Sequence, residues 1–406
     1  MDYPSVLIYT VCSICYLPKA LVLSKSVYQN SKNQVIIYLV DKKNSIVQDY
    51  PWAQIRWIED ENIPDLYNLA FKYDVTEFST CIKPLLALRL LELSSKVIFL
   101  DPDICVYSSL DDIKNELDHY PILLTPHYST PIELREENYD LAMMRFGSFN
   151  LGFFAVSSEP EAKEFLSWWS ERCIHLGFFE SQFGLSVDQK WVSIAPCFFP
   201  NLKIIFNPGY NVAFWNLHER VIEKSDQGYI VNGESELVFF HFSSFDEKNP
   251  RKVSKRAHGW VYSGRNDVDE ICDNYAARLA ENNNGYTNIL YGFDYMNNGW
   301  YISPTLRRAY AAVQDDFNCI DPFDSNGPML DFIQINHLRE KRNIPYSPAG
   351  TIDIPRHRRK FKYVNRGLRF LLKILGPNSF SNLSRLFVYV SSFRQNRELW
   401  KIPSAH

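Results

Sequence analysis

The feature that most constrains the fold of this 406-residue chain is a regular alternation of short apolar runs with helical patterns. The apolar runs that are typical of strands are residues 6–10, 34–40, 97–100, 121–125 and 151–156. The helical patterns cover residues 17–27, 62–72, 77–93 and 159–174. Strands that alternate with helices in this way favour a mostly parallel sheet with helices on both faces. The sequence therefore predicts an α/β fold.

Two carboxylates end one of the predicted strands. The run from Lys96 to Leu100 is followed by Asp101, Pro102 and Asp103. Ligands of open α/β sheets collect beyond the carboxyl ends of the strands. Mg²⁺ and Mn²⁺ take one or two carboxylates in such places and leave their other positions to phosphate oxygens. Asp-Pro-Asp is also ordinary turn chemistry, so the motif alone leaves both interpretations open.

Three further segments carry polar residues in strand-like or helix-like surroundings. Asn150 and Gly152 begin an apolar strand, Asp188 and Gln189 open a helical pattern, and His241 stands in an aromatic strand. Each has a structural interpretation as well as a functional one. The first pair is compatible with a turn, Asp188 with a helix N-terminal acid, and His241 with a hydrogen-bonded core histidine.

Taken together, these motifs resemble the GT-A glycosyltransferases. Within them, the chain is similar to the bacterial glycogenin-like, galactosyltransferase-type (family 8-like) enzymes of cell-surface polysaccharide assembly. The resemblance rests on the order of four motifs: the Asp101–Asp103 pair, Asn150-Leu-Gly152, Asp188-Gln189 and His241. It covers residues 5–260, and the segments 73–77, 125–127 and 209–216 also fit this group.

The resemblance implies a metal-dependent enzyme that uses a nucleotide-sugar donor, a UDP-sugar, and a glycan or lipid-linked glycan acceptor. It implies that Asp101, Asp103 and His241 hold Mn²⁺ or Mg²⁺. Asp188 and Gln189 would face the donor sugar and the acceptor. The residues expected to contact the donor nucleotide are Thr10, Cys12, Lys83, Asp101, Asn150 and Lys255. Whether the reaction inverts or retains the anomeric configuration stays open.

One departure from the family pattern concerns the donor diphosphate. The family has Lys-Pro-Trp after the histidine, whereas this chain has the segment 249–255, which ends in Lys255. Two alternatives also remain: a sugar-nucleotide pyrophosphorylase, and a non-catalytic glycan- or membrane-binding protein on the same sheet. The pyrophosphorylase expects a glycine-rich phosphate loop after the first strand. Residues 12–18 contain no glycine, which disfavours it.

The C-terminal end of the chain differs from the rest in charge. From Arg356 onward there are twelve Lys and Arg residues against one acid, Glu398, so this tail carries +11 and the remainder −15 of a total of −4. Its cations alternate with apolar residues, and Gly376-Pro377 divides it into two predicted amphipathic helices. Such helices favour an anionic membrane surface, although a hairpin docked on the acidic body is the alternative. The acidic body disfavours nucleic acid as a partner.

These patterns predict three parts: a GT-A domain over residues 1–290, an irregular extension over 291–354, and a basic helical tail over 355–406. The first residues lack a basic start and a long apolar run, so no signal peptide is expected. The eight cysteines are scattered, which is typical of free thiols in a reducing compartment. We therefore expect a cytoplasmic protein, peripheral at the inner face of the membrane if the tail binds lipid.

Overall fold

A computed structural model of the chain describes residues 4–133, 139–226, 228–256, 265–317, 319–341 and 358–403. The chain divides into two compact units. The first joins Met1–Pro64 to Val75–Tyr291, and the second joins Asp65–Asp74 to Gly292–His406. All the predicted site residues belong to the first unit.

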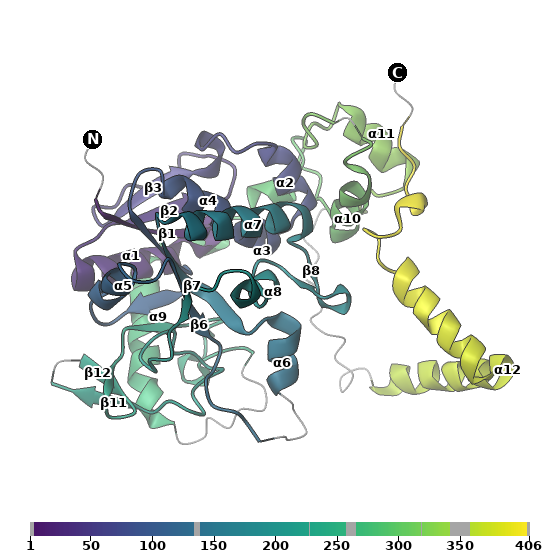
Figure 1. Cartoon of the computed structure of the whole chain (residues 1–406). Coiled ribbons are helices and arrows are strands. Elements are labelled where there is room, and N and C mark those ends of the chain that lie inside the picture. Colours follow the sequence, from purple (N-terminus) through teal and green to yellow (C-terminus); the bar gives the residue numbers. More distant parts are fainter. Residues whose placement is uncertain are drawn as a thin grey trace. The chain divides into compact units, whose positions relative to one another are not determined.

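A seven-stranded sheet lies at the centre of the first unit, in the order β10-β6-β7-β4-β1-β2-β3 (Figure 1). Its strands are β1 (Val6–Cys12), β2 (Val35–Leu39), β3 (Ala53–Trp57), β4 (Lys96–Leu100), β6 (Ile122–Pro126), β7 (Phe149–Ser157) and β10 (Leu202–Ile204). Smaller sheets are formed by β5 (Ile104–Val106) with β14 (Phe239–His241), by β8 (Phe179–Glu180) with β9 (Leu185–Ser186), and by β11 (Ile222–Ser225), β12 (Gly228–Val231) and β13 (Ser235–Glu236).

Most neighbouring strands of the large sheet run parallel. β4, β1, β2 and β3 are parallel to one another, and so are β10 and β6. β7 is antiparallel to both of its neighbours, β4 and β6. The predicted α/β class with a mostly parallel sheet is confirmed.

The order of the strands reverses beside β1. The chain continues from β1 to β2 and β3 on one side, and β4 lies on the other side of β1. At such a switch point the loops that leave the two strands part in opposite directions, which opens a crevice at the carboxyl end of the sheet. The residues that follow β1 and β4 are therefore placed opposite each other.

Helices cover both faces of this sheet. The helices of the first unit are α1 (Leu17–Ser31), α3 (Val75–Cys81), α4 (Lys83–Leu90), α5 (Asp111–Glu116), α6 (Tyr139–Phe146), α7 (Pro160–Leu176), α8 (Gln189–Val192) and α9 (Asp269–Asn282). On one face, Leu21 of α1 and Ile113 of α5 share a core with Ile98 of β4. On the other, Trp169 of α7 packs edge-on against Phe154 of β7. Burial from both sides explains why the strands are continuous apolar runs in the sequence.

The structure corrects one helix and adds elements that the sequence did not reveal. The predicted helix over 77–93 is two helices, α3 and α4, which meet at Ile82. Pro84 lies in the first turn of α4, where its missing N–H is not needed, whereas inside a helix it would break a hydrogen bond. Sequence analysis also missed the edge strand β3 and the three-residue strand β5, because neither is a long apolar run.

The second unit is helical. Its helices are α2 (Leu66–Lys72), α10 (Pro304–Val313), α11 (Pro328–Ile335) and α12 (Arg358–Val390). Arg307 of α10 is buried and ties α10 to the segment 65–74. Its guanidinium donates to the carbonyl oxygens of Ala70, Phe71, Tyr73 and Phe293 and to the carboxylate of Asp294. These bonds explain why a segment from early in the chain belongs to the C-terminal unit.

Helix α12 is interrupted at Gly376, whose φ of 74° and ψ of 164° are not helical, and Pro377 follows. The predicted division of the tail into two helices at Gly376-Pro377 is confirmed. Among the residues that the structure describes, no helix combines the length and the apolar character that crossing a bilayer requires. The predicted limits at 290 and 355 stay predictions, and residue 355 lies outside the described residues.

Candidate metal and donor site

Asp101 and Asp103 lie at the switch point, directly after β4. The turn between them is held by the backbone: the N–H of Ile104 donates to the carbonyl of Asp101 at 3.0 Å. The N–H of Asp101 donates to the carbonyl of Gly152 on β7 at 2.7 Å. Asp103 is buried, whereas 24% of the Asp101 side chain is exposed. The pair is therefore rigid and open to solvent on the Asp101 side.

His241 reaches these acids because β14 pairs with β5, the strand that follows Asp103. His241 lies opposite Ile104 in this antiparallel pair. Its Nε2 is 3.1 Å from Oδ1 of Asp103 and 3.8 Å from Oδ2 of Asp101. One ligand atom from each of the three residues lies within 4.8 Å of the others. The structure thus brings the three predicted metal ligands together.

Asn211 determines which nitrogen of His241 faces the acids. The amide nitrogen of Asn211 donates to Oγ1 of Thr125 at 2.9 Å and to Oδ1 of Asn150 at 3.0 Å. Its carbonyl oxygen is then the atom that faces Nδ1 of His241, 3.2 Å away. Because an amide oxygen only accepts, Nδ1 carries a proton, and Nε2 is the nitrogen that faces Asp101 and Asp103.

This arrangement fits a divalent cation. A nitrogen lone pair 3.1 Å from a carboxylate oxygen is repulsive unless a proton or a cation lies between them. Two ligands about 2.1 Å from an octahedral cation, at right angles, lie about 3 Å apart, which matches this spacing. One imidazole with two carboxylates is a donor set that suits Mn²⁺ or Mg²⁺.

Gly152 makes room for the His241 ring. A Cβ at this position would lie 2.3 Å from Cε1 and 2.6 Å from Nδ1 of His241. The N–H of Gly152 donates to Oδ1 of Asn150 at 3.1 Å, the same atom that accepts from Asn211. The Asn-Leu-Gly segment of β7 therefore supports the histidine from behind. Asn150 itself is buried within this network.

Lys83 is a buried cation that links two of the predicted site acids. Its ammonium lies 3.0 Å from Asp101 and 3.2 Å from Asp188, and it donates to the carbonyl of Leu151 at 3.3 Å. Burial alone would lower the pKa of Lys83, but the carboxylates of Asp101 and Asp188 outweigh it and raise the pKa. Lys83 therefore stays charged, and its position depends on both acids.

Asp188 and Gln189 lie where the chain enters α8, as the sequence predicted. Val187, before them, has a φ of 44°, a costly conformation for a β-branched residue, and strain of this kind gathers at functional sites. Burial raises the pKa of Asp188, and the Lys83 ammonium counteracts part of that rise. Both ends of the Gln189 amide are bonded to backbone, at Leu151 and Phe146.

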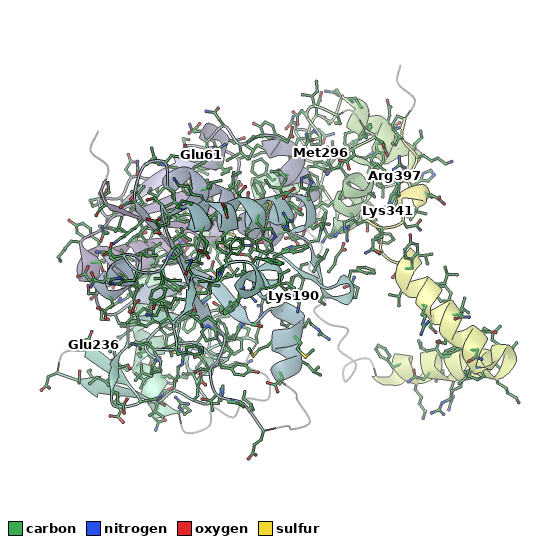
Figure 2. The ribbon with its side chains drawn as sticks, viewed as in Figure 1. Glu61, Lys190, Glu236, Met296, Lys341 and Arg397 are labelled. Carbon is green, nitrogen blue, oxygen red and sulfur yellow. The ribbon has the colours of Figure 1, made fainter. Side chains whose placement is uncertain are left out.

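The rest of α8 is also fixed to its surroundings. Figure 2 shows Lys190 next to α6, and its ammonium donates to the carbonyl of Met144. The indole N–H of Trp169 donates to the carbonyl of Asp188 at 3.0 Å. Asp188 is thus held from the side of α7 as well as by Lys83.

Three other residues were expected to contact the nucleotide, and no hydrogen bond or ion pair joins their side chains to this cluster among the described residues. Thr10 and Cys12 belong to β1 and are buried, Cys12 in the core that β1 shares with α1. Lys255 is exposed, and its backbone N–H donates to the carbonyl of Ser244 at 2.9 Å. Their assignment to donor binding stays a prediction.

Sequence analysis missed two residues that touch the metal ligands. Asn211 was covered only by the segment 209–216, and its hydrogen bond to His241 depends on a bridge between Val212 and Phe240. Lys19 of α1 was not singled out, yet its ammonium lies 3.8 Å from Oδ2 of Asp103. A lysine in the first turn of a helix after the first strand was the available signal.

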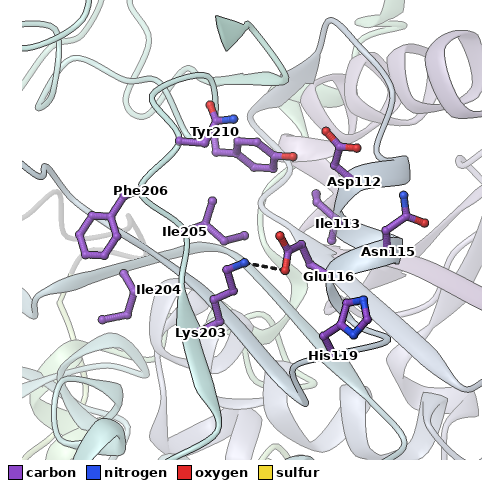
Figure 3. Close-up of a pocket in the computed structure, with 11 residues that line it drawn as sticks. Asp112, Ile113, Asn115, Glu116, His119, Lys203, Ile204, Ile205, Phe206 and Tyr210 are labelled. Atoms are coloured by element: carbon purple, nitrogen blue, oxygen red, sulfur yellow. Dashed lines mark hydrogen bonds and ion pairs between the residues drawn. The ribbon is translucent and has the colours of Figure 1, made fainter.

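A separate cavity of about 580 Å³ lies at the β10 edge of the sheet (Figure 3). Glu116 and Lys203 form an ion pair of 2.6 Å in its wall, and Tyr210 and His119 also line it. None of the predicted site residues lines this cavity. The predicted ligands therefore gather in the metal-ligand cluster and not in this cavity.

The chain is similar to two proteins that are described as uncharacterized. No family model matches the chain. The chain is 24% identical over 246 residues to the uncharacterized protein YfnF of Bacillus subtilis (strain 168). The matched region covers 58% of this chain and 80% of YfnF. The chain is also 24% identical over 245 residues to the uncharacterized protein YfnD of the same organism, covering 58% and 76%.

Some solved structures of glycosyltransferases are similar to the chain. The galactosyltransferase LgtC, in complex with donor and acceptor sugar analogs, shares 15% identity over 68% of this chain and 96% of its own, with a TM-score of 0.41. Mouse xyloside xylosyltransferase 1 shares 14% identity over 59% and 97%, with a TM-score of 0.36. At such scores the likeness does not decide the function, which has to rest on the site of this chain.

Proposed function

We propose that this chain is a metal-dependent glycosyltransferase of the GT-A type. It transfers a sugar from a nucleotide-sugar donor, a UDP-sugar, to a glycan or lipid-linked glycan in capsule- or lipopolysaccharide-type synthesis. The observation that carries the proposal is the convergence of Asp101, Asp103 and Nε2 of His241 at the switch point of the sheet. Nucleotide ligands bind at this place in open α/β sheets.

The chemistry of the cluster matches this reaction. A divalent cation bound by the two acids and His241 would act as a Lewis acid on the donor phosphates and stabilise the leaving nucleoside diphosphate. Lys83 holds Asp101 in place and carries a charge that the carboxylates sustain. We assign Asp188 and Gln189 to the wall that orients the donor sugar, since Asp188 is joined to Asp101 through Lys83.

The test is nucleotide binding by the full-length chain. The protein is titrated by calorimetry with UDP, GDP, ADP, CMP and dTDP, with and without Mn²⁺. We expect UDP to bind tightly only when Mn²⁺ is present. Tight binding of another of these nucleotides would keep the enzyme class and replace the donor. Absence of binding to all of them, with glycan binding that needs no metal, would overturn the proposal in favour of a glycan-binding protein.

We further propose that α12 lies on an anionic membrane surface, with the protein on the cytoplasmic side. Between Arg358 and Val390 the chain contains no acid. Tyr363, Phe370 and Ile374 are each more than 60% exposed, among cations on the same helix. Apolar side chains interspersed with cations are typical of helices that lie at a lipid interface.

Vesicle co-sedimentation tests this second proposal. The full-length protein is mixed with phosphatidylcholine vesicles that contain or lack phosphatidylserine, at low and at high salt. We expect binding only to the anionic vesicles, weakened by salt because surface charges are screened. Equal partition into both kinds of vesicle, or none into either, would contradict the proposal.

A further inference from the structure

Two lysines, Lys83 and Lys19, lie close to the acids of the site, and they differ in the hydrogen bonds that their ammonium groups donate. The three N–H groups of Lys83 face three oxygens, on Asp101, Asp188 and Leu151. Lys19 lies 3.8 Å from Asp103, beyond hydrogen-bonding distance, and 4.2 Å from the centre of the Tyr16 ring. Among the residues that the structure describes, it donates no side-chain hydrogen bond. The N–H groups of Lys83 are therefore all occupied by protein oxygens, whereas those of Lys19 are available to a ligand.

The surroundings of Lys19 call for an anion. Only 9% of Lys19 is exposed, and a cation so removed from water is costly unless it is paired. Asp103, its ion-pair partner among the described residues, is also a metal ligand in the proposed function. A divalent cation on Asp103 would oppose the charge of Lys19. An anion that touches both cations removes this conflict.

The start of α1 adds a second attraction for an anion. Tyr16 is the residue before the helix, no side chain caps the first turn, and no acidic residue lies in it. Free N–H groups at a helix start carry partial positive charge. In α1 the N–H of Leu17 donates to the carbonyl of Ile14 and Pro18 has no N–H, so the N–H of Lys19 is the first that remains. Because α1 follows β1, the side chain of Lys19 in this turn comes close to Asp103, which follows β4. Tyr16, before the helix, is 43% exposed, whereas Leu17 to Ala20 are buried.

Tyr275 of α9 provides an independent sign of a missing partner. Its ring stacks on Phe242 with centroids 3.7 Å apart, and the N–H of Phe242 donates to the carbonyl of Asp103. The Tyr275 hydroxyl is buried and has no hydrogen-bond partner among the described residues. Burial raises the pKa of Tyr275, and Asp103 and Tyr16 are among the groups that raise it further. Tyr275 thus offers a buried hydroxyl without a partner, on a ring that packs against the residue after His241.

We infer that Lys19 and the first turn of α1 form the subsite for the donor diphosphate, in place of Lys255. The inference rests on the proposed function and deepens it, since it names the cation that accompanies the metal. Lys255 is exposed on a turn and lacks the desolvated setting of Lys19. This would explain how the chain manages without the Lys-Pro-Trp segment of the family it resembles.

The test compares Lys19→Ala with Lys25→Ala, a control on the same helix whose side chain is 42% exposed. The probe is the nucleoside diphosphate that the wild-type protein binds most tightly with Mn²⁺, among UDP, GDP, ADP, CDP and dTDP. We expect Lys19→Ala to weaken it by about 10- to 100-fold, the loss of a charge-assisted contact. Mn²⁺ alone should bind Lys19→Ala as tightly as the wild type, or more tightly, because a positive neighbour of Asp103 is gone.

Each other outcome has a distinct meaning. Unchanged diphosphate affinity in Lys19→Ala, or a comparable loss in Lys255→Ala alone, would overturn the inference and leave the proposed function standing. Loss of Mn²⁺ binding together with the diphosphate would make Lys19 a structural support of Asp103, and would also overturn it. If the wild-type protein binds none of the five nucleotides, the proposed function fails, and the inference fails with it.

Discussion

The metal-ligand cluster and helix α12 depart from the usual arrangement of a folded protein in opposite ways. Around Asp103 the protein buries charged and polar side chains, including Lys83, Asp188 and His241. Along α12 it exposes apolar ones, such as Phe370 at 63%. Buried charge and exposed apolar surface both cost free energy unless a partner compensates for them. The comparison teaches that the two regions differ in the kind of partner that would compensate for them, which is why we propose a cation with an anion for one and lipid for the other.

The two regions also differ in how they are held. The polar groups around His241 are connected by hydrogen bonds that run through Asn211, Asn150 and Thr125. A connected network of this kind fixes the ligands before any ion binds. The apolar side chains of α12 have no comparable constraint because they are exposed, and the lipid interface that we propose for them would need an apolar face and not a fixed geometry. Mutations should therefore act sharply in the first region and gradually in the second.

The largest effect is expected from removing a metal ligand. Asp101→Ala and Asp103→Ala should each lower sugar transfer by about 10³-fold, since the cation supplies several kcal/mol of charge stabilisation. Circular dichroism should show an unchanged fold. Activity is measured with Mn²⁺ and the donor found by the nucleotide titration. Near-normal turnover in either variant would break the assignment of the cluster to a metal.

A smaller loss is expected from the residue behind His241. Asn211→Gly removes the amide but keeps a residue that tolerates the φ of 52° found there. Mn²⁺ affinity should fall by about 10- to 100-fold, because the imidazole loses the acceptor that orients it. Calorimetric titration with Mn²⁺ measures this. An unchanged affinity would mean that the network around His241 does not serve the metal.

The tail should respond in proportion to its charge. Arg369→Gln combined with Lys373→Gln should weaken binding to anionic vesicles by about 30-fold, at about 1 kcal/mol for each cation. Sugar transfer to a soluble acceptor should stay unchanged, which separates this region from the cluster. If the double variant binds vesicles like the wild type, charge is not what brings α12 to a membrane.

Two glycines offer the most direct contrast between the regions. Gly152→Ala should lower the free energy of unfolding by about 1–3 kcal/mol, because the new Cβ meets the His241 ring. Gly367→Ala, in α12, meets nothing within 4 Å and should be neutral or stabilising by up to about 1 kcal/mol in the helix. Urea denaturation measures both changes. Equal effects at the two positions would contradict the difference in packing.

Many features of the fold were predictable because their signals are local. The strands at 97–100 and 151–156 are apolar runs, and burial on both faces produces such runs. The break at Gly376-Pro377 follows from the backbone of those two residues. The three metal ligands were named from the sequence through a family resemblance, and the structure brings them together.

Other features depend on pairings between distant segments. The sequence does not reveal that β7 runs antiparallel to β4, nor that the segment 65–74 packs with Arg307 of the second unit. Asn211 meets His241 only because Val212 bridges to Phe240.

What the sequence by itself determined is the α/β class, the acids after β4 and the basic, divided tail, because each is written in consecutive residues. Only the tertiary structure decided which side chains lie next to these residues. Lys83 is bound to Asp101 and Asp188, while Lys19 lies next to Asp103 without a hydrogen bond. The physical reason is that strand order and register place side chains from distant segments a few ångströms apart, and no local pattern encodes that order.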